Sequence, residues 1–156
     1  QVCIFMKGTL TWWKILRTNI NKYFMNIAEV VNERSTCLSR QVGCILVKNK
    51  QILSTGYNGS IRGHIHCDEF TCKKNCDNTI HAEVNAVISA AYRGVKISKC
   101  DVYTTTSPCI DCLRILLNLD VQNIYYLEKY RTKWVPVDKI NDLLESHYKK
   151  IGYKQL

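Results

Sequence analysis

The stretch that decides the fold contains IHAEVNAVISAAY (residues 80–92), DVYTT (101–105) and PCIDC (108–112). The first piece is rich in strong helix formers and ends near Gly94, so it predicts a helix. The second is a β-prone run, and the third begins a helix that we expect at 109–118, just after Pro108. A second strand is predicted at 123–127 and a last helix at 137–147. Strands that alternate with helices indicate an α/β fold.

The residues before this stretch extend the same pattern. Apolar residues at helical spacing predict a helix at 21–34, and two β-prone runs at 42–47 and 51–55 predict a hairpin. Glycines and an asparagine between 56 and 63 predict a flexible loop without a regular element. We therefore expect a single domain over residues 21–156, preceded by an N-terminal segment (1–20) of uncertain role.

Composition limits the classes of protein to consider. The 156 residues suit one domain, and no apolar run approaches the roughly 18 residues of a membrane span. Nine cysteines, an odd number, lie near histidines and without a visible secretion signal, which favours metal binding in the reducing cytoplasm over disulfides. The formal charge of +9 favours an anionic partner, and a phosphorylated small substrate would satisfy it as well as a nucleic acid would.

A split metal signature is the most specific motif in the chain. His81, Cys109 and Cys112 offer one imidazole and two thiolates, which suit Zn²⁺, and three protein ligands leave its fourth position open for catalysis. Glu83 lies two residues after the histidine, so it can act on a zinc-activated water without being a ligand. The alternative, a core histidine, a solvated glutamate and two buried cysteines, would not explain why all four occur at these offsets.

The residues around this signature resemble those of the deoxycytidylate deaminases, within the zinc-dependent cytidine and deoxycytidylate deaminase family. The resemblance covers about two thirds of the chain, from Tyr23 to about Tyr130. The matching stretches are Tyr23-Phe24-Met25, Glu33-Arg34-Ser35-Thr36-Cys37, Arg40-Gln41-Val42-Gly43, Ser54-Thr55-Gly56-Tyr57-Asn58-Gly59, His66-Cys67-Asp68-Glu69, His81-Ala82-Glu83-Val84-Asn85-Ala86, Tyr103-Thr104-Thr105 and Ser107-Pro108-Cys109.

This resemblance implies a fold and an activity. The expected fold is a three-layer α/β/α arrangement around a central mixed sheet of about five strands. The expected enzyme is a zinc-dependent hydrolase that deaminates dCMP to dUMP and ammonia, which feeds thymidylate synthesis. Relatives are commonly hexamers, with dCTP as activator and dTTP as inhibitor, so the resemblance implies a homo-oligomer with these effectors.

The resemblance also implies roles for residues outside the metal signature. Asn58, Asn85 and Tyr130 match substrate-binding positions of the family. An amide or a phenol suits such a role, since it can pair with a sugar hydroxyl or a phosphate. For Asn85 a structural amide is the alternative. A regulatory loop is expected around Tyr57, Gly59 and Arg62, although Arg62 also fits a solvated loop cation.

A second cluster of cysteines and histidines lies between Cys37 and Cys76. Many relatives carry a structural zinc in this region, so the resemblance implies one here, which would stabilise the loop around Asn58. Our preferred ligands are Cys37, His66, Cys72 and Cys76, with Cys67 as the alternative to His66. Free buried cysteines are the competing interpretation.

Three other functions remain open from the sequence. A deaminase that acts on a base in RNA, such as a tRNA adenosine deaminase, shares the zinc signature and would use the positive charge. Another free cytosine nucleotide could also be the substrate, because no phosphate-specific motif is present. A zinc-stabilised binding module without catalysis would not need Glu83 or an open metal position.

Overall fold

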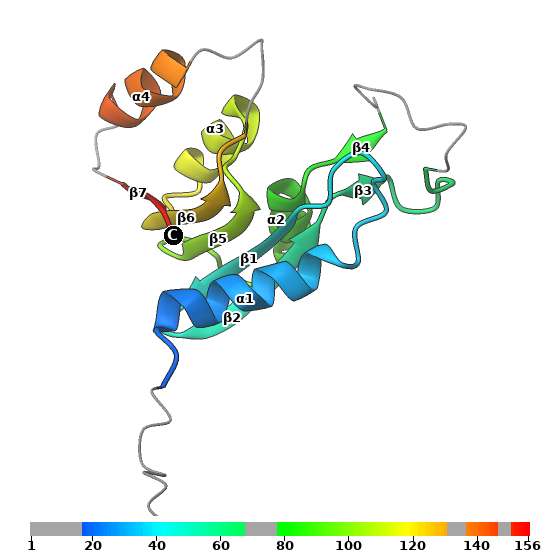
Figure 1. Ribbon diagram of the computed structural model, residues 1–156, viewed down its shortest axis with the longest axis horizontal. Coiled ribbons are helices and arrows are strands. Elements are labelled where there is room, and N and C mark those ends of the chain that lie inside the picture. The colour runs from blue at the N-terminus through cyan, green and yellow to red at the C-terminus, as the bar shows by residue number, and fades with distance from the viewer. Residues whose placement is uncertain (1–16, 68–77, 131–136, 147–150) are drawn as a thin grey trace, which may run out of the picture.

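A five-stranded mixed sheet forms the centre of the computed structural model, which describes residues 17–67, 78–130, 137–146 and 151–156 (Figure 1). The strand order is β2 (Gln51–Tyr57), β1 (Gly43–Lys48), β5 (Asp101–Thr106), β6 (Asn123–Glu128) and β7 (Gly152–Gln155). β1 pairs antiparallel with both β2 and β5, whereas β5, β6 and β7 are parallel. The expected mixed sheet of about five strands is confirmed.

One face of the sheet is covered by α1 (Ile20–Asn32), which lies in front of the sheet in Figure 1. Phe24, Met25 and Ala28 are buried against this face, as the helical spacing of 21–34 predicts. On the sheet side, Ile45 and Val47 of β1 meet them because alternate residues of a strand point to the same face. The strand at 42–47 is therefore buried on both faces.

The opposite face packs against α2 (Ala82–Tyr92), α3 (Ile110–Asn118) and α4 (Val137–Ser146). Cys44 and Leu46, the other alternating residues of β1, belong to this second core with Val102 and Ile124. Helices on both faces make three layers, so the predicted α/β/α architecture is confirmed. No helix in the described parts of the chain is long and apolar enough to cross a membrane.

A close approach at Gly56 fixes where α2 lies on the sheet. A Cβ at this position would collide with the backbone nitrogen of Ala86 and the backbone oxygen of Ala82, both in α2. Ser54 adds a buried hydrogen bond from its hydroxyl to the Ala86 carbonyl (2.7 Å). The start of α2 is thereby held against the end of β2.

The structure corrects two expectations about regular elements. Within the predicted loop at 56–63, β2 continues to Tyr57, and β3 (Gly59–Ser60) pairs with β4 (Thr79–Ile80) in a small second sheet. The strand β7 was missed because four residues near the C-terminus give little periodicity to detect. The predicted division at residue 20 stays a prediction, since residues 1–16 lie outside the described part.

Candidate metal centre and active site

The two halves of the metal signature meet at one edge of the central sheet. His81 is the N-cap of α2 and follows β4, and Cys109 is the N-cap of α3 and follows β5. Partial positive charge at both helix N-termini favours a thiolate over a thiol there. Both halves of the signature therefore lie at strand-to-helix junctions.

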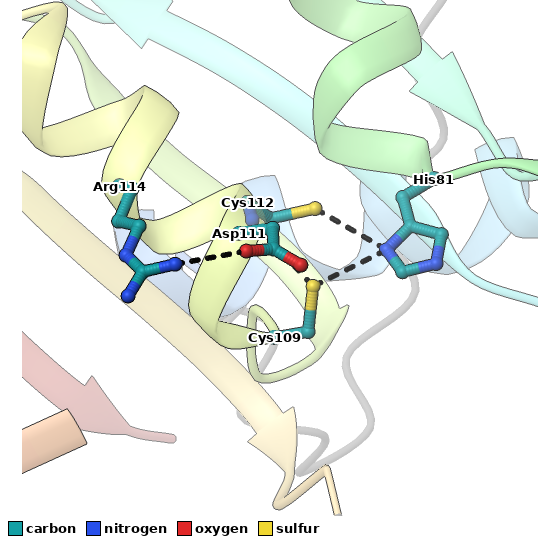
Figure 2. Close-up of polar contacts among 5 residues, drawn as sticks. All are labelled: His81, Cys109, Asp111, Cys112 and Arg114. Carbon is teal, nitrogen blue, oxygen red and sulfur yellow. Dashed lines mark hydrogen bonds and ion pairs between the residues drawn. The ribbon is translucent and has the colours of Figure 1, made fainter. Parts of the chain in front are cut away.

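His81, Cys109 and Cys112 point toward one another from these two helices (Figure 2). His81 Nδ1 lies 3.3 Å from Cys112 Sγ and 3.4 Å from Cys109 Sγ. Typical zinc bond lengths at a tetrahedral angle would place a nitrogen and a sulfur ligand about 3.5 Å apart. The three side chains therefore fit a zinc ion in donor type and in spacing, and exposed His81 leaves one side of the site open to solvent.

The charges at this centre are coupled. A hydrogen bond with Cys112 lowers the pKa of Cys109 to about 4, against the effect of burial, and His81 lowers it further. The same hydrogen bond and burial raise the pKa of Cys112, whereas the hydrogen bond with Cys109 raises the pKa of His81. A thiolate at Cys109 beside an imidazolium at His81 is favoured, so zinc binding would release two protons, one from His81 and one from Cys112.

Glu83 is the one fully buried carboxylate among the residues that the structure describes. It lies in the first turn of α2 with 5% of its surface exposed, and its carboxyl group forms a side-chain hydrogen bond with Cys112. Burial raises the pKa of Glu83 to about 7, and its backbone hydrogen bond and the charge of His81 act in the opposite direction. A carboxyl group beside the metal ligands can thus exchange a proton near neutral pH.

Asn58 is buried, and its amide is used within the protein. Its Oδ1 accepts hydrogen bonds from Val42 N (2.8 Å) and the Ser35 hydroxyl (2.7 Å). Its Nδ2 donates to the Arg40 carbonyl (2.7 Å). The structure therefore gives Asn58 a role in fixing the 35–42 segment against the end of β2, and its predicted contact with substrate stays a prediction.

Asn85 and Tyr130 are less buried than Asn58. Asn85 Nδ2 donates to the Tyr57 carbonyl (2.8 Å), which orients the amide and leaves its oxygen without a donor among the described residues. Tyr130 N donates to the hydroxyl of Ser107 (2.8 Å), two residues before Cys109. The charges of Cys109 and Glu83 both raise the pKa of the Tyr130 phenol, after partial burial, so the phenol lies within electrostatic range of the metal centre.

Two of the four preferred ligands of the second predicted zinc site fall outside the described residues. Cys72 and Cys76 belong to the segment 68–77, while Cys37, His66 and Cys67 are described. Cys37 N donates to the Ser35 hydroxyl (3.2 Å), so Cys37 is linked to the Asn58 network. Within the described ranges, His81, Cys109 and Cys112 are the one group that could hold a metal ion.

The three residues of the predicted regulatory loop differ in their contacts. The guanidinium of Arg62 lies 5.7 Å from the ring centre of Tyr92, at the end of α2 farthest from His81. Gly59 pairs with Ile80 in the small second sheet, and Tyr57 is exposed. None of these contacts tests regulation, which stays a prediction.

Two residues near the site were missed as functional candidates. Ser107 accepts the hydrogen bond from Tyr130 N. Its place directly before Pro108-Cys109 was the feature of the sequence that could have indicated it. Arg40 places its guanidinium over the Tyr130 ring, 5.4 Å from the ring centre. Nothing local identifies Arg40, because its contact lies 90 residues away in sequence.

Comparisons with known proteins agree with this geometry. Residues 18–128 match the family described as cytidine and deoxycytidylate deaminase zinc-binding region. ComE operon protein 2 of Bacillus subtilis is 37% identical over 119 residues, which are 74% of this chain and 63% of that protein. The deoxycytidylate deaminase of Schizosaccharomyces pombe is 33% identical over 125 residues, 73% of this chain and 38% of that enzyme. The chain thus spans less than two thirds of either relative.

A solved structure is similar over nearly the whole chain. It is the dCMP deaminase of the cyanophage S-TIM5 in complex with dCMP and dUMP, with a TM-score of 0.75 and 28% identity. The match covers 90% of this chain and 99% of that one. A tRNA:A34 deaminase structure, with a TM-score of 0.57 and 16% identity, shares the fold alone.

Proposed function

Because the chain belongs to the zinc-binding cytidine and deoxycytidylate deaminase family, we propose that it hydrolyses dCMP to dUMP and ammonia. One observation carries the proposal: the buried carboxyl group of Glu83 lies next to the three side chains that could hold a metal ion, His81, Cys109 and Cys112. The named relative from yeast and the phage structure with dCMP and dUMP favour this nucleotide as substrate. The product would supply thymidylate synthesis.

His81, Cys109 and Cys112 would hold the metal through Nδ1 and two Sγ atoms. A zinc ion bound there supplies Lewis acidity, which makes water a better nucleophile near neutral pH. Helices α2 and α3 fix the positions of these ligands, since His81 and Cys109 are their N-cap residues. Cys112 N donates to Cys109 Sγ (3.5 Å), which supports the thiolate form of that ligand.

Glu83 performs the proton transfers. Its carboxylate accepts a proton from the attacking water and delivers it to the ring nitrogen next to the reacting carbon. It then carries a second proton to the exocyclic amine, which leaves as ammonia when the C–N bond breaks. Burial keeps bulk water away from the carboxyl group, so protons pass between substrate and Glu83.

Asn85 and Tyr130 would position the nucleotide. The Asn85 side chain is held by its bond to Tyr57, so its free oxygen can accept a hydrogen bond from a sugar hydroxyl without further ordering cost. Tyr130 can donate from its phenol, which is protonated at neutral pH as in any tyrosine, and partial burial raises its pKa further.

A second, structural zinc is part of the proposal. Cys37, His66, Cys72 and Cys76 would form a closed set of four ligands, with Cys67 as the alternative to His66. The hydrogen bond from Cys37 N to Ser35 would transmit this constraint to Asn58. Metal analysis tests it. Two zinc per chain in the wild type and one in Cys37→Ser support the site, whereas equal zinc content in both contradicts it.

We also propose a homo-oligomer in the cytoplasm, with dCTP and dTTP as effectors. Large apolar side chains exposed on α2, Ile88 at 52% and Tyr92 at 82%, support a contact between copies. Sedimentation of the zinc-loaded protein with and without each nucleotide tests both points. A monomer whose activity ignores dCTP and dTTP would contradict them.

The activity is tested by ammonia release from purified, zinc-loaded protein. We expect dCMP to be deaminated faster than dCTP, deoxycytidine or a tRNA hairpin offered at equal concentration. Glu83→Gln should retain zinc and lose activity by about 100- to 10,000-fold, the usual contribution of general acid–base catalysis. A preference for the hairpin would favour the RNA deaminase instead, and an inert wild type would contradict the proposal.

A further inference from the structure

The C-terminal strand β7 ends at the same edge of the sheet as the metal centre. It pairs in parallel with β6, beside which it lies in Figure 1. Leu156 N donates to the Tyr126 carbonyl (2.9 Å), and Gln155 Nε2 donates to the Leu127 carbonyl (2.8 Å). Because β5, β6 and β7 run in the same direction, the end of β7 lies at the edge where β5 leads to Cys109.

Tyr153 carries a hydroxyl group from β7 toward this edge. Its ring packs on that of Tyr126, with 4.8 Å between the ring centres, and it is partly buried against the core below α2 and α3. Its phenol lies within hydrogen-bonding range of the Ser107 side chain. Burial raises the pKa of this phenol to about 12, the Ser107 hydrogen bond acts in the opposite direction, and the charge of Glu83 adds to the rise. The Tyr153 hydroxyl is therefore close to the active site.

Ser107 joins two segments that meet beside the metal centre. Its N donates to the Glu128 carbonyl (2.7 Å), and its hydroxyl accepts from Tyr130 N (2.8 Å). Two residues later, Cys109 offers its sulfur to the metal group and caps α3. A serine hydroxyl has one proton to donate, so the bond from Tyr130 N leaves that proton for the Tyr153 oxygen. Donation in this direction agrees with the lowering effect of Ser107 on the pKa of Tyr153.

We propose that Tyr153 is a positioning residue, whose phenol holds the Ser107 hydroxyl in the rotamer that accepts from Tyr130 N. A serine side chain has three staggered rotamers, and the other two would release the Tyr130 backbone. Tyr153 thereby sets the segment after β6 relative to the junction that carries Cys109. The inference rests on the proposed deamination of a cytosine nucleotide, to which it adds a residue of the C-terminal strand that acts through Ser107.

Amide hydrogen exchange tests the position of the Tyr130 backbone without relying on turnover. Tyr153→Phe keeps the ring that packs on Tyr126 and removes the hydroxyl. In the zinc-loaded variant, the Tyr130 amide should exchange about 2- to 10-fold faster than in the wild type, the factor that corresponds to one neutral hydrogen bond. The Leu156 amide, which donates to Tyr126 in the same sheet, should keep its wild-type rate. Equal acceleration of both amides would mean that Tyr153 supports the fold in general, and would overturn the inference.

Kinetics of paired variants show whether Tyr153 acts through Ser107. We expect Tyr153→Phe to lower kcat/KM for dCMP by about 3- to 10-fold while the zinc content stays at the wild-type level. In the Ser107→Ala background the same change should have no further effect, because the hydroxyl that Tyr153 holds is already absent. Additive losses in the double variant would contradict the link. Lys154→Gln is the matched control, since Lys154 is exposed and points to the other face of β7, and it should behave like the wild type.

The two arms separate this inference from the proposed function. If the wild type deaminates dCMP and Tyr153→Phe changes neither kcat/KM nor the exchange of the Tyr130 amide, the inference is wrong while the proposed function stands. If the wild type deaminates no cytosine nucleotide, the proposed function fails, and the exchange rate of the Tyr130 amide still decides about Tyr153. An unchanged exchange rate in Tyr153→Phe overturns the inference in either case.

Discussion

The amide of Asn58 bonds to the Arg40 carbonyl over 2.7 Å and thereby joins the end of β2 to the segment that precedes β1. The same amide accepts from Val42 N and from Ser35, so three hydrogen bonds converge on one buried side chain. A buried amide satisfied in this way specifies one loop conformation, because any other would leave polar groups unpaired.

We therefore predict that Asn58→Ala destabilises the protein by about 2–4 kcal/mol, since at least one buried donor or acceptor loses its partner. Urea unfolding of the zinc-loaded protein measures the change. Asn26→Ala is the matched control: Asn26 is exposed within α1, and alanine there should be neutral or slightly stabilising. Equal unfolding midpoints for the two variants would show that the Asn58 network contributes nothing.

The contact between Gly56 and α2 gives a second prediction. Gly56→Ala should destabilise by about 1–3 kcal/mol or more and lower activity, because a Cβ there would push against the backbone of Ala82 and Ala86. The helix that carries Glu83 would have to move. Gly63→Asn serves as the control, since a side chain at Gly63 meets open space and asparagine tolerates its positive φ. If both variants behave like the wild type, α2 is not held at Gly56.

The layers and the metal ligands could be predicted because their signals are local. The helical spacing of Phe24 and Ala28 and the three-residue offset of Cys109 and Cys112 can be read directly from the sequence. To group His81 with these cysteines, one further assumption is needed, namely that the two helix N-termini lie at the same edge of the sheet. The resemblance to the deaminases supplied the order of the layers.

Contacts between distant segments could not be predicted in this way. The sequence cannot show that the side chain of Asn58 bonds to residues 35–42, because these partners lie far from it along the chain. Arg40 and Tyr130 are brought together by the antiparallel pairing of β1 with β5 and the parallel pairing of β5 with β6. Register between strands decides such contacts, and a single strand carries little information about it.

The metal ligands give a third prediction. Cys112→Ser should lower zinc affinity by more than about 100-fold. Loss of a residue that only supports a ligand typically lowers metal affinity by about 10- to 100-fold, and here a thiolate ligand itself is removed. Zinc content after dialysis against a weak chelator measures this. Cys100→Ser is the control, since Cys100 is equally buried but lies outside the His81 group. Loss of zinc from both variants alike would mean that general destabilisation, and not ligation, releases the metal.

The buried thiol of Cys100 gives a prediction about alkaline stability. Burial, followed by the charge of Asp101, raises the pKa of Cys100 from 9.0 to about 11 in the folded protein. Above pH 9 the unfolded chain therefore loses this proton while the folded chain keeps it, and the free energy of unfolding falls as pH rises toward 11. A two-unit difference corresponds to about 2–3 kcal/mol at most. Between pH 8 and pH 11, the free energy of unfolding measured with urea should decline less steeply in Cys100→Ala than in the wild type, because the variant lacks this thiol. Burial also raises the pKa of the Tyr103 phenol, but Tyr103 is present in both proteins and contributes equally to both. Parallel declines in the two proteins would mean that another group releases the proton on unfolding, and would contradict the assignment to Cys100.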